Sequence, residues 1–264
     1  MNYRERLATA AAERGNLCVG IDPMPSVLEA WGVSRDVAGL ERVARGIVEV
    51  LGQQVAAFKP QSAFFEPLGA AGMTVLERVL ADIRQCGALS ILDVKRGDIG
   101  SSMMGYAEAF LSPEAPLSAD AITVNPYLGI GALQPAFDLA LAHGRGVYVL
   151  ARTSNPEGEP IQTARTSEKA TAQFVLDEIS RLNCDHEFLI GAVLGATRAD
   201  LGCDPSQFNG SILAPGIGAQ GGRLDELGNI FGCALKQVLP TVSRQIIGGG
   251  RQQLQARFDE LRSR

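Results

Sequence analysis

The run ILDVKRGDIGSS, at residues 91–102, places an unusual group of charges at the end of an apolar segment. Side chains alternate along a β-strand, so Asp93 and Lys95 are expected to project to one side, and Asp98 follows just after the strand. Another lysine, Lys59, lies in the apolar run AAFKPQ at residues 56–61. Opposite charges that face one interior are costly unless they are used, so this pattern predicts a functional site.

The chemistry that suits these charges is the loss of CO₂ from an anion. Lysines and carboxylates that alternate in a partly desolvated pocket keep one another ionised, so Lys95 is expected to remain an ammonium. A fixed ammonium can stabilise a developing carbanion and then protonate it without a metal or an organic cofactor. The alternative is a salt-bridge network that only orients loops. Lys59, on the neighbouring predicted strand, makes that alternative weaker.

The glycine-rich run APGIGAQGG, at residues 214–222, indicates a phosphate site. Glycine backbone can approach a phosphate closely and offer N–H donors, Gln220 adds a side-chain donor, and Arg244 can bind the phosphate oxygens. Gly221 is included among the expected substrate-binding residues. Arg251, at the end of IIGGGR, is an alternative to Arg244. A flexible surface loop beside a surface arginine is the simpler interpretation of the pattern.

Eight short apolar runs predict the strands that position these residues. They lie at 16–22, 56–61, 89–95, 121–126, 146–152, 188–195, 211–216 and 237–244. Helical patterns occur at the N-terminus and at 39–54, 72–85 and 167–183. Eight strands about thirty residues apart are typical of a (β/α)₈ TIM barrel, an α/β fold. We therefore expect a single domain over residues 1–264; a doubly wound open sheet, the alternative, would more naturally stop at five or six strands.

Other polar residues follow the predicted strands, at the end of the barrel where active sites are found. Asp22 lies before Pro23 and either binds a hydroxyl group or starts a turn. Asn125 lies before Pro126 and is a turn former first and a ligand contact second. Ser154 either hydrogen-bonds a heterocycle or caps a loop. This concentration of polar residues on one rim favours an enzyme.

Composition disfavours several other classes of protein. The chain has 264 residues, of which 46% are hydrophobic and 20% charged, as in ordinary globular proteins. Its net charge is −5, and it has no dense basic tract and no apolar run of membrane-spanning length, so we expect neither nucleic acid nor membrane as a partner. The five cysteines are widely spaced, and only His143 and His186 could supply imidazole ligands. We therefore expect a cytoplasmic protein without a metal site.

The chain resembles the orotidine 5′-phosphate decarboxylases, most closely the bacterial subgroup with somewhat longer chains. The resemblance extends over nearly the whole chain. It rests on the motifs LCVGIDP, FKPQSAFFE, LDVKRGDIGSS, TVNPYLG, RTSNPEG, APGIGAQGG and LPTVSR. The combination of a lysine on the second strand with D-x-K-x-x-D on the third is its most specific part.

The resemblance implies decarboxylation of orotidine 5′-phosphate to UMP in pyrimidine biosynthesis, without a cofactor. It implies a catalytic tetrad of Lys59, Asp93, Lys95 and Asp98, in which Lys95 donates a proton to C6 of the pyrimidine. It further implies that Asp98 reaches into the site of a neighbouring subunit, so that the active unit is a homodimer.

The resemblance also implies the residues that bind the substrate. Ile99 and Ser102 would enter the neighbouring site with Asp98 and contact the base and the ribose. Asp22 and Lys59 would bind ribose hydroxyls. The pyrimidine would be bound by Ser154, and the phosphate by Gln220 and Arg244.

Two other functions fit part of the pattern. Mg²⁺-dependent sugar-phosphate decarboxylases and aldolases also carry D-x-K-x-x-D, but they place an acidic metal ligand near the end of the second strand. Lys59 occupies that place here, and Glu66 is a poor substitute. A degenerate barrel would bind a phosphorylated ligand without turnover, but such a protein would be free to lose the four charged residues that this chain retains.

Overall fold

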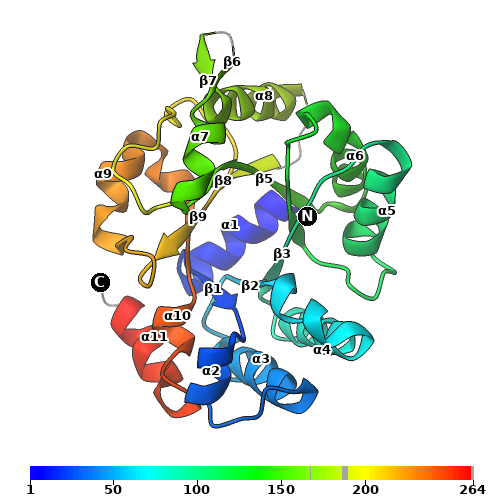
Figure 1. Ribbon diagram of the computed structural model, residues 1–264, viewed down its shortest axis with the longest axis vertical. Helices are drawn as coiled ribbons and strands as arrows, with labels where there is room; N and C mark the ends of the chain where they lie inside the picture. The colour runs from blue at the N-terminus through cyan, green and yellow to red at the C-terminus, as the bar shows by residue number, and fades with distance from the viewer. Residues whose placement is uncertain (167, 186–189, 263–264) are drawn as a thin grey trace.

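A closed barrel of eight parallel strands forms the centre of the molecule (Figure 1). The computed structural model describes residues 1–166, 168–185 and 190–262. The barrel strands are Cys18–Ile21 (β1), Ala57–Pro60 (β2), Leu89–Arg96 (β3), Ala121–Val124 (β4), Gly146–Arg152 (β5), Ile190–Leu194 (β8), Ile212–Ile217 (β9) and Val238–Val242 (β10). Their order around the barrel is β1-β10-β9-β8-β5-β4-β3-β2. The predicted (β/α)₈ barrel is confirmed.

All eight predicted strands are present, most with slightly different ends. Every residue of β1, β2, β4, β8 and β10 is buried, as expected for parallel strands with a packed interior on one face and helices on the other. β10 ends at Val242, so Arg244 begins the next helix instead of ending the strand. Residues 188 and 189 of the predicted sixth strand lie outside the described residues.

Helices surround the barrel. They are Tyr3–Arg14 (α1), Pro25–Ala30 (α2), Val37–Leu51 (α3), Gly69–Gln85 (α4), Gly100–Leu111 (α5), Gln134–His143 (α6), Glu159–Gln162 (α7), Thr171–Asp185 (α8), Leu227–Phe231 (α9), Arg244–Ile247 (α10) and Leu254–Arg262 (α11). In α3, the Asp36 side chain accepts a hydrogen bond from Gly39 N at 2.8 Å and so caps the helix. Its buried stripe includes Leu40, Val43 and Ile47, and burial of each such side chain contributes about 1.5–3 kcal/mol.

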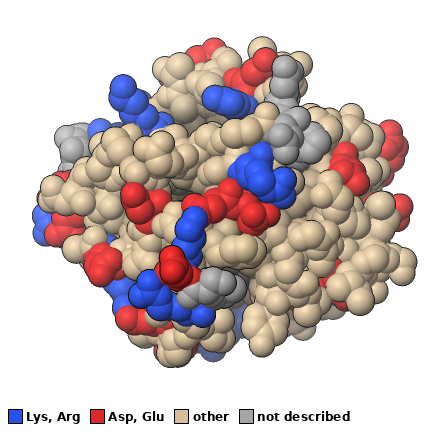
Figure 2. Space-filling view, turned by 90° about the horizontal axis from the view of Figure 1, so that it is seen from above, with Lys and Arg blue, Asp and Glu red and all other residues tan. Residues whose placement is uncertain are grey.

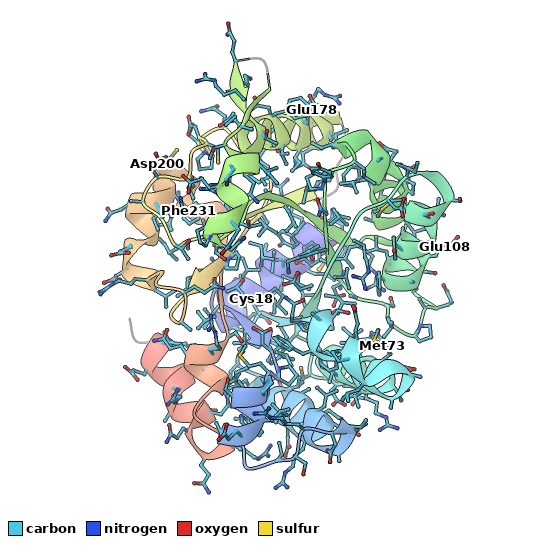
Figure 3. The ribbon with its side chains drawn as sticks, viewed as in Figure 1. Cys18, Met73, Glu108, Glu178, Asp200 and Phe231 are labelled. Carbon is cyan, nitrogen blue, oxygen red and sulfur yellow. The ribbon has the colours of Figure 1, made fainter. Side chains whose placement is uncertain are left out.

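α1 closes the end of the barrel at which the strands begin. Tyr3 and Leu7 of this helix pack against a buried cluster that includes Cys18 and Leu89. The Tyr3 hydroxyl lies 3.2 Å from that of Tyr148 on β5. In Figure 3, Cys18 lies near the centre of the ring of elements, while Glu108 and Glu178 lie at its outer edge. The opposite end of the barrel remains open for the site.

The helix predicted at 167–183 starts later than expected. Arg165–Thr166 (β6) and Lys169–Ala170 (β7) form a small antiparallel hairpin, and α8 begins at Thr171. The backbone N–H and hydroxyl of Thr171 both donate to the Ala164 carbonyl, which closes the hairpin before the helix can begin. Residue 167 lies outside the described residues. Figure 2 shows the molecule from above, with basic and acidic side chains interspersed on this face.

Candidate active site

A cavity of about 390 Å³ lies at the C-terminal ends of the barrel strands. Seven of the predicted site residues line it: Asp22, Lys59, Asp93, Lys95, Ser154, Gln220 and Arg244. They follow or end six strands that are far apart in the sequence, and closure of the barrel brings them together. The predicted concentration of polar groups on one rim is therefore present.

The Asp93 carboxylate receives four hydrogen bonds. Its Oδ2 atom accepts from Lys59 Nζ at 2.7 Å and from Gln61 Nε2 at 2.9 Å. Its Oδ1 atom accepts from Lys95 Nζ at 2.6 Å and from Thr123 Oγ1 at 2.8 Å. Because both oxygens are bound from two sides, the carboxylate has a defined orientation between two ammonium groups.

The charges of this cluster support one another. Burial by itself would raise the pKa of Asp93, but the Lys59 and Lys95 ammonium groups outweigh it and hold that pKa well below its usual range. Burial would likewise lower the pKa of Lys59, but the Asp93 and Asp22 carboxylates raise it above its ordinary value. Lys59 and Asp93 therefore remain an ion pair at neutral pH. This matches the mutual stabilisation expected from the alternating charges.

The backbone of Lys95 is in a strained conformation. Lys95 is the one non-glycine residue in the described part of the chain with a positive φ, at 47°. Such a conformation costs an L-residue about 1–2 kcal/mol. It occurs where the pairing of β3 with β4 shifts register, between Leu92 and Arg96. Irregularities of this kind redirect side chains, and here the Lys95 ammonium lies at the cavity, with 44% of the side chain exposed.

One wall of the cavity has unused polar atoms. Among the described residues, Asp22 Oδ1 and Ser243 Oγ are buried without a hydrogen-bond partner. Both residues line the cavity, at the ends of β1 and β10. A buried polar atom without a partner is costly, so this wall suits a ligand that carries hydroxyl groups.

The glycine-rich loop after β9 differs from the expectation in one respect. Gly218 N donates to Gly222 O, Gly221 N to Gly218 O and Gly222 N to Gly216 O, at 2.8–3.0 Å. These three N–H groups are thus used within the loop, because it folds back on itself in a tight turn. Gln220 lines the cavity together with Gly216, Ile217 and Ala219, so its side-chain amide is one donor that the loop can present there.

The structure separates the two candidate phosphate arginines. Arg244, the first residue of α10, lines the cavity beside Gln220. Arg251 lies elsewhere: its Nη2 atom is 3.0 Å from Glu49 Oε2, and its Nη1 atom donates to the Gly46 carbonyl of α3. Of these two arginines, Arg244 is therefore the one that lies at the cavity with Gln220.

Comparisons with known proteins agree with this geometry. The family model described as orotidine 5′-phosphate decarboxylase / HUMPS family matches residues 15–257. The chain is 54% identical over 252 residues to the orotidine 5′-phosphate decarboxylase of Salinispora arenicola, covering 94% of this chain and 91% of that one. It is 51% identical over 251 residues to the Streptomyces coelicolor protein of the same name, covering 94% and 90%.

The chain belongs to the orotidine 5′-phosphate decarboxylase family. A solved structure from Streptomyces avermitilis, provisionally named for this activity, superposes with a TM-score of 0.92 at 48% identity and covers 99% of this chain and 95% of that one. Membership in this family makes the protein a carboxy-lyase of pyrimidine biosynthesis. The resemblance inferred from the motifs is therefore confirmed.

Five residues predicted for the decarboxylase site do not line the cavity of the single chain: Asp98, Ile99, Ser102, Asn125 and Gly221. Asp98 Oδ1 accepts a hydrogen bond from Ile99 N at 2.8 Å, and the Ile99 side chain is 63% exposed. Asn125 Oδ1 accepts from Tyr127 N at 3.0 Å, so this residue forms a turn. The predicted entry of Asp98, Ile99 and Ser102 into a neighbouring site stays a prediction.

Several polar residues that line the decarboxylase cavity were not predicted, and three of them stand out by their contacts or by an unpaired atom. Gln61 and Thr123 bind Asp93, and Ser243 contributes an unpaired hydroxyl. Gln61 lies in the motif that contains Lys59, so its proximity to the charged cluster could have been inferred. Thr123 is a single polar residue within an apolar strand, and only its position across from Asp93 reveals a role.

Glu66, the poor substitute for the acidic metal ligand of the Mg²⁺ enzymes, is engaged in other contacts. Glu66 Oε1 accepts from Ser62 Oγ at 2.5 Å and from Arg96 Nη2 at 2.7 Å. Within residues 1–166, 168–185 and 190–262, no three His, Cys, Asp or Glu side chains are grouped so as to hold a metal ion. His186 lies outside these ranges.

None of the helices in the described part of the chain is both long and apolar enough to cross a membrane.

Proposed function

We propose that this protein decarboxylates orotidine 5′-phosphate to UMP without a metal or an organic cofactor. The observation that carries this proposal is the Asp93 carboxylate held between the ammonium groups of Lys59 and Lys95, at 2.7 and 2.6 Å, on the wall of a cavity. Family membership indicates which reaction takes place, and the charged cluster provides the groups that can stabilise the carbanion and protonate it.

Loss of CO₂ leaves an electron pair on C6 of the pyrimidine ring. In this proposal, the Lys95 ammonium stabilises that charge as it develops and then transfers a proton to C6. The Lys59–Asp93 ion pair keeps Lys95 in place, because Asp93 Oδ1 binds Lys95 Nζ while Oδ2 binds Lys59 Nζ. No external electron sink is needed, since the ammonium is in place before the bond breaks.

The remaining cavity residues bind the substrate. Asp22 and Lys59 bind the ribose hydroxyls, a role supported by the unpaired Asp22 Oδ1 atom. Ser154 binds the pyrimidine, and Gln220 and Arg244 bind the phosphate. Phosphate binding far from C6 supplies energy that orders the site around the reacting carbon.

The proposal also covers assembly and location. Asp98, with Ile99 and Ser102, completes the site of a second copy, so the working unit is a homodimer. The exposure of Ile99 supports this, because a large apolar side chain beside a reactive site is better covered. Residues 1–264 act as a single domain. All five cysteines are free thiols, which supports a reducing cytoplasmic location.

The test is absorbance-monitored conversion of orotidine 5′-phosphate to UMP by the purified protein in EDTA. Wild type is expected to turn over, and Lys95→Ala to lower kcat by at least about 10³-fold, since both charge stabilisation and proton donation are lost. Lys236→Ala, at an exposed lysine, is the matched control and keeps full activity.

Two results would contradict the proposal. Activity that disappears in EDTA and returns with Mg²⁺ would favour the metal-dependent alternative. A folded wild type that binds UMP but does not decarboxylate the substrate would favour a non-catalytic phosphate-binding barrel.

A further inference from the structure

Thr123 is a buried polar residue in the middle of an apolar strand. It lies on β4, between Ile122 and Val124, and its exposed fraction is 1%. Its hydroxyl group contacts both reactive residues of β3. Thr123 Oγ1 lies 2.8 Å from Asp93 Oδ1 and 3.0 Å from the backbone nitrogen of Lys95.

The direction of these hydrogen bonds follows from the groups involved. The Lys95 backbone N–H can only donate, so the Thr123 oxygen accepts from it. An ionised carboxylate can only accept, so the Thr123 hydroxyl donates its hydrogen to Asp93 Oδ1. The same Asp93 oxygen accepts from Lys95 Nζ at 2.6 Å. One hydroxyl group therefore links the backbone of Lys95 to the carboxylate that binds its ammonium, and the three residues form a closed ring.

The ring lies at the irregularity in β3. Leu92 pairs with Ile122 and Arg96 with Val124, so three residues of β3 face one residue of β4, which is Thr123. In a regular ladder the Lys95 N–H would donate to a backbone carbonyl. Here the Thr123 hydroxyl accepts from it instead. This contact accompanies the left-handed φ of 47° at Lys95, the conformation that brings its ammonium to the cavity.

We propose that Thr123 is a positioning residue for the proton donor, and that its hydroxyl holds the turned backbone of Lys95 and one oxygen of Asp93 in the reactive arrangement. This inference rests on the proposed role of Lys95. Thr123 does not contribute a proton to the substrate. It acts through Lys95, whose ammonium must meet C6 with little freedom, because small displacements of a reacting group lower rates strongly.

The decisive comparison is between Thr123→Val and Thr123→Ser. Valine retains the shape of the side chain and loses the hydroxyl group, whereas serine retains the hydroxyl group and loses a methyl group. We expect Thr123→Val to lower kcat by about 10- to 100-fold, while its affinity for UMP stays within about 3-fold of wild type. Thr123→Ser is expected to keep kcat within about 3-fold of wild type. The measurements are steady-state turnover of orotidine 5′-phosphate and calorimetric titration with UMP.

The outcomes separate positioning from packing. A folded Thr123→Val variant with wild-type kcat would overturn the inference. So would a Thr123→Val variant whose UMP affinity and kcat fall by the same factor, or a Thr123→Ser variant whose kcat is as low as that of Thr123→Val. If the valine variant does not fold, Thr123→Ala replaces it, because alanine and serine differ by one oxygen atom. Thr123→Ala as active as Thr123→Ser would then overturn the inference.

The Lys95→Ala variant is assayed alongside, so that failure of the proposed function can be recognised. If Lys95→Ala is inactive but Thr123→Val has the kcat of wild type, the positioning role proposed for Thr123 is contradicted and the proposed function is not. If Lys95→Ala retains wild-type turnover, the role of Lys95 is wrong, and the inference about Thr123 falls with it.

Discussion

At the level of single residues, Asp93 is the carboxylate that pairs with both ammonium groups of the site, those of Lys59 and Lys95. Two ammonium groups, an amide and a hydroxyl group donate to its two oxygens. Removal of one member of a buried ion pair leaves the other charge without compensation, which costs about 3–5 kcal/mol. Asp93→Asn should therefore lower the free energy of unfolding by about this amount at pH 7, measured by urea denaturation.

The same variant makes a prediction about pH. The pKa of Asp93 is lower in the folded than in the unfolded chain, so its stabilising effect is present above the unfolded pKa and is lost as the pH falls. The stability difference between wild type and Asp93→Asn should shrink below about pH 5. A difference that stays constant down to pH 3 would contradict the ion-pair account. Asp138→Asn, at an exposed residue of α6, is the control and should change stability by less than about 0.5 kcal/mol.

Arg244 and Arg251 allow a matched test of phosphate binding. Arg244→Ala should lower kcat/KM for orotidine 5′-phosphate by about 100-fold, because a charge-assisted contact to phosphate is lost. It should affect reaction of the phosphate-free nucleoside far less. Arg251→Ala, which removes a contact to Glu49 away from the cavity, should leave both reactions unchanged. Equal losses on the two substrates in Arg244→Ala would count against the assignment.

At the scale of elements, α1 closes the barrel through close contact with β5. A Cβ atom added at Gly146 would lie 2.4 Å from Cδ1 of the buried Tyr3 ring, so the helix and the strand would have to separate. Gly146→Ala should lower the free energy of unfolding by about 1–3 kcal/mol, as overpacking usually does. Thermal and urea unfolding would measure this change.

The control for this prediction is Gly228→Ala on α9. There the new Cβ atom would lie 3.9 Å from Leu235 Cδ2, an ordinary contact, so stability should be kept or slightly increased. If Gly146→Ala were as stable as Gly228→Ala, the contact between α1 and the barrel would contribute less than its geometry indicates.

At the scale of the whole molecule, the proposed dimer can be tested by complementation. Each site is proposed to combine Lys95 of one subunit with Asp98 of the other, so Lys95→Ala and Asp98→Ala homodimers should both be nearly inactive. In a mixed dimer, one of the two sites regains both residues. Random reassociation of an equal mixture should restore about a quarter of wild-type activity, because half of the dimers are mixed.

The result depends on exchange of subunits, which can be followed by native mass spectrometry of the mixture. No recovery of activity in a mixture that contains mixed dimers would place Asp98 in its own subunit's site, or outside the site. A monomeric protein with full activity would exclude the shared site altogether.

Much of the fold could be predicted from the sequence, because each barrel strand is a short apolar run. The prediction was wrong at the start of α8, where residues 168–170 have a helical pattern but Lys169–Ala170 pairs with Arg165–Thr166. The cause is the pairing of the hairpin itself, closed by the double hydrogen bond from Thr171 to Ala164 seven residues earlier, which a helical pattern of apolar residues does not reveal. In the glycine-rich loop, which was expected to offer backbone donors to a phosphate, three N–H groups bind carbonyls within the loop, and the phosphate contact stays a prediction.

The order of residues was enough to show which charges are present and that they lie at strand ends. Alternation along β3 predicted that Asp93 and Lys95 lie together, and they do, although the irregular backbone at Lys95 and not regular alternation directs its side chain. The spacing of the runs was enough to predict the barrel. Three features became visible only in the folded chain: Arg244 and not Arg251 lines the cavity, Lys95 has a left-handed backbone, and Thr123 joins Lys95 to Asp93. These features depend on closure of the barrel and on the register between neighbouring strands, which bring residues that are distant in the sequence into contact. A shift of register between two strands cannot be predicted from the order of residues along one of them.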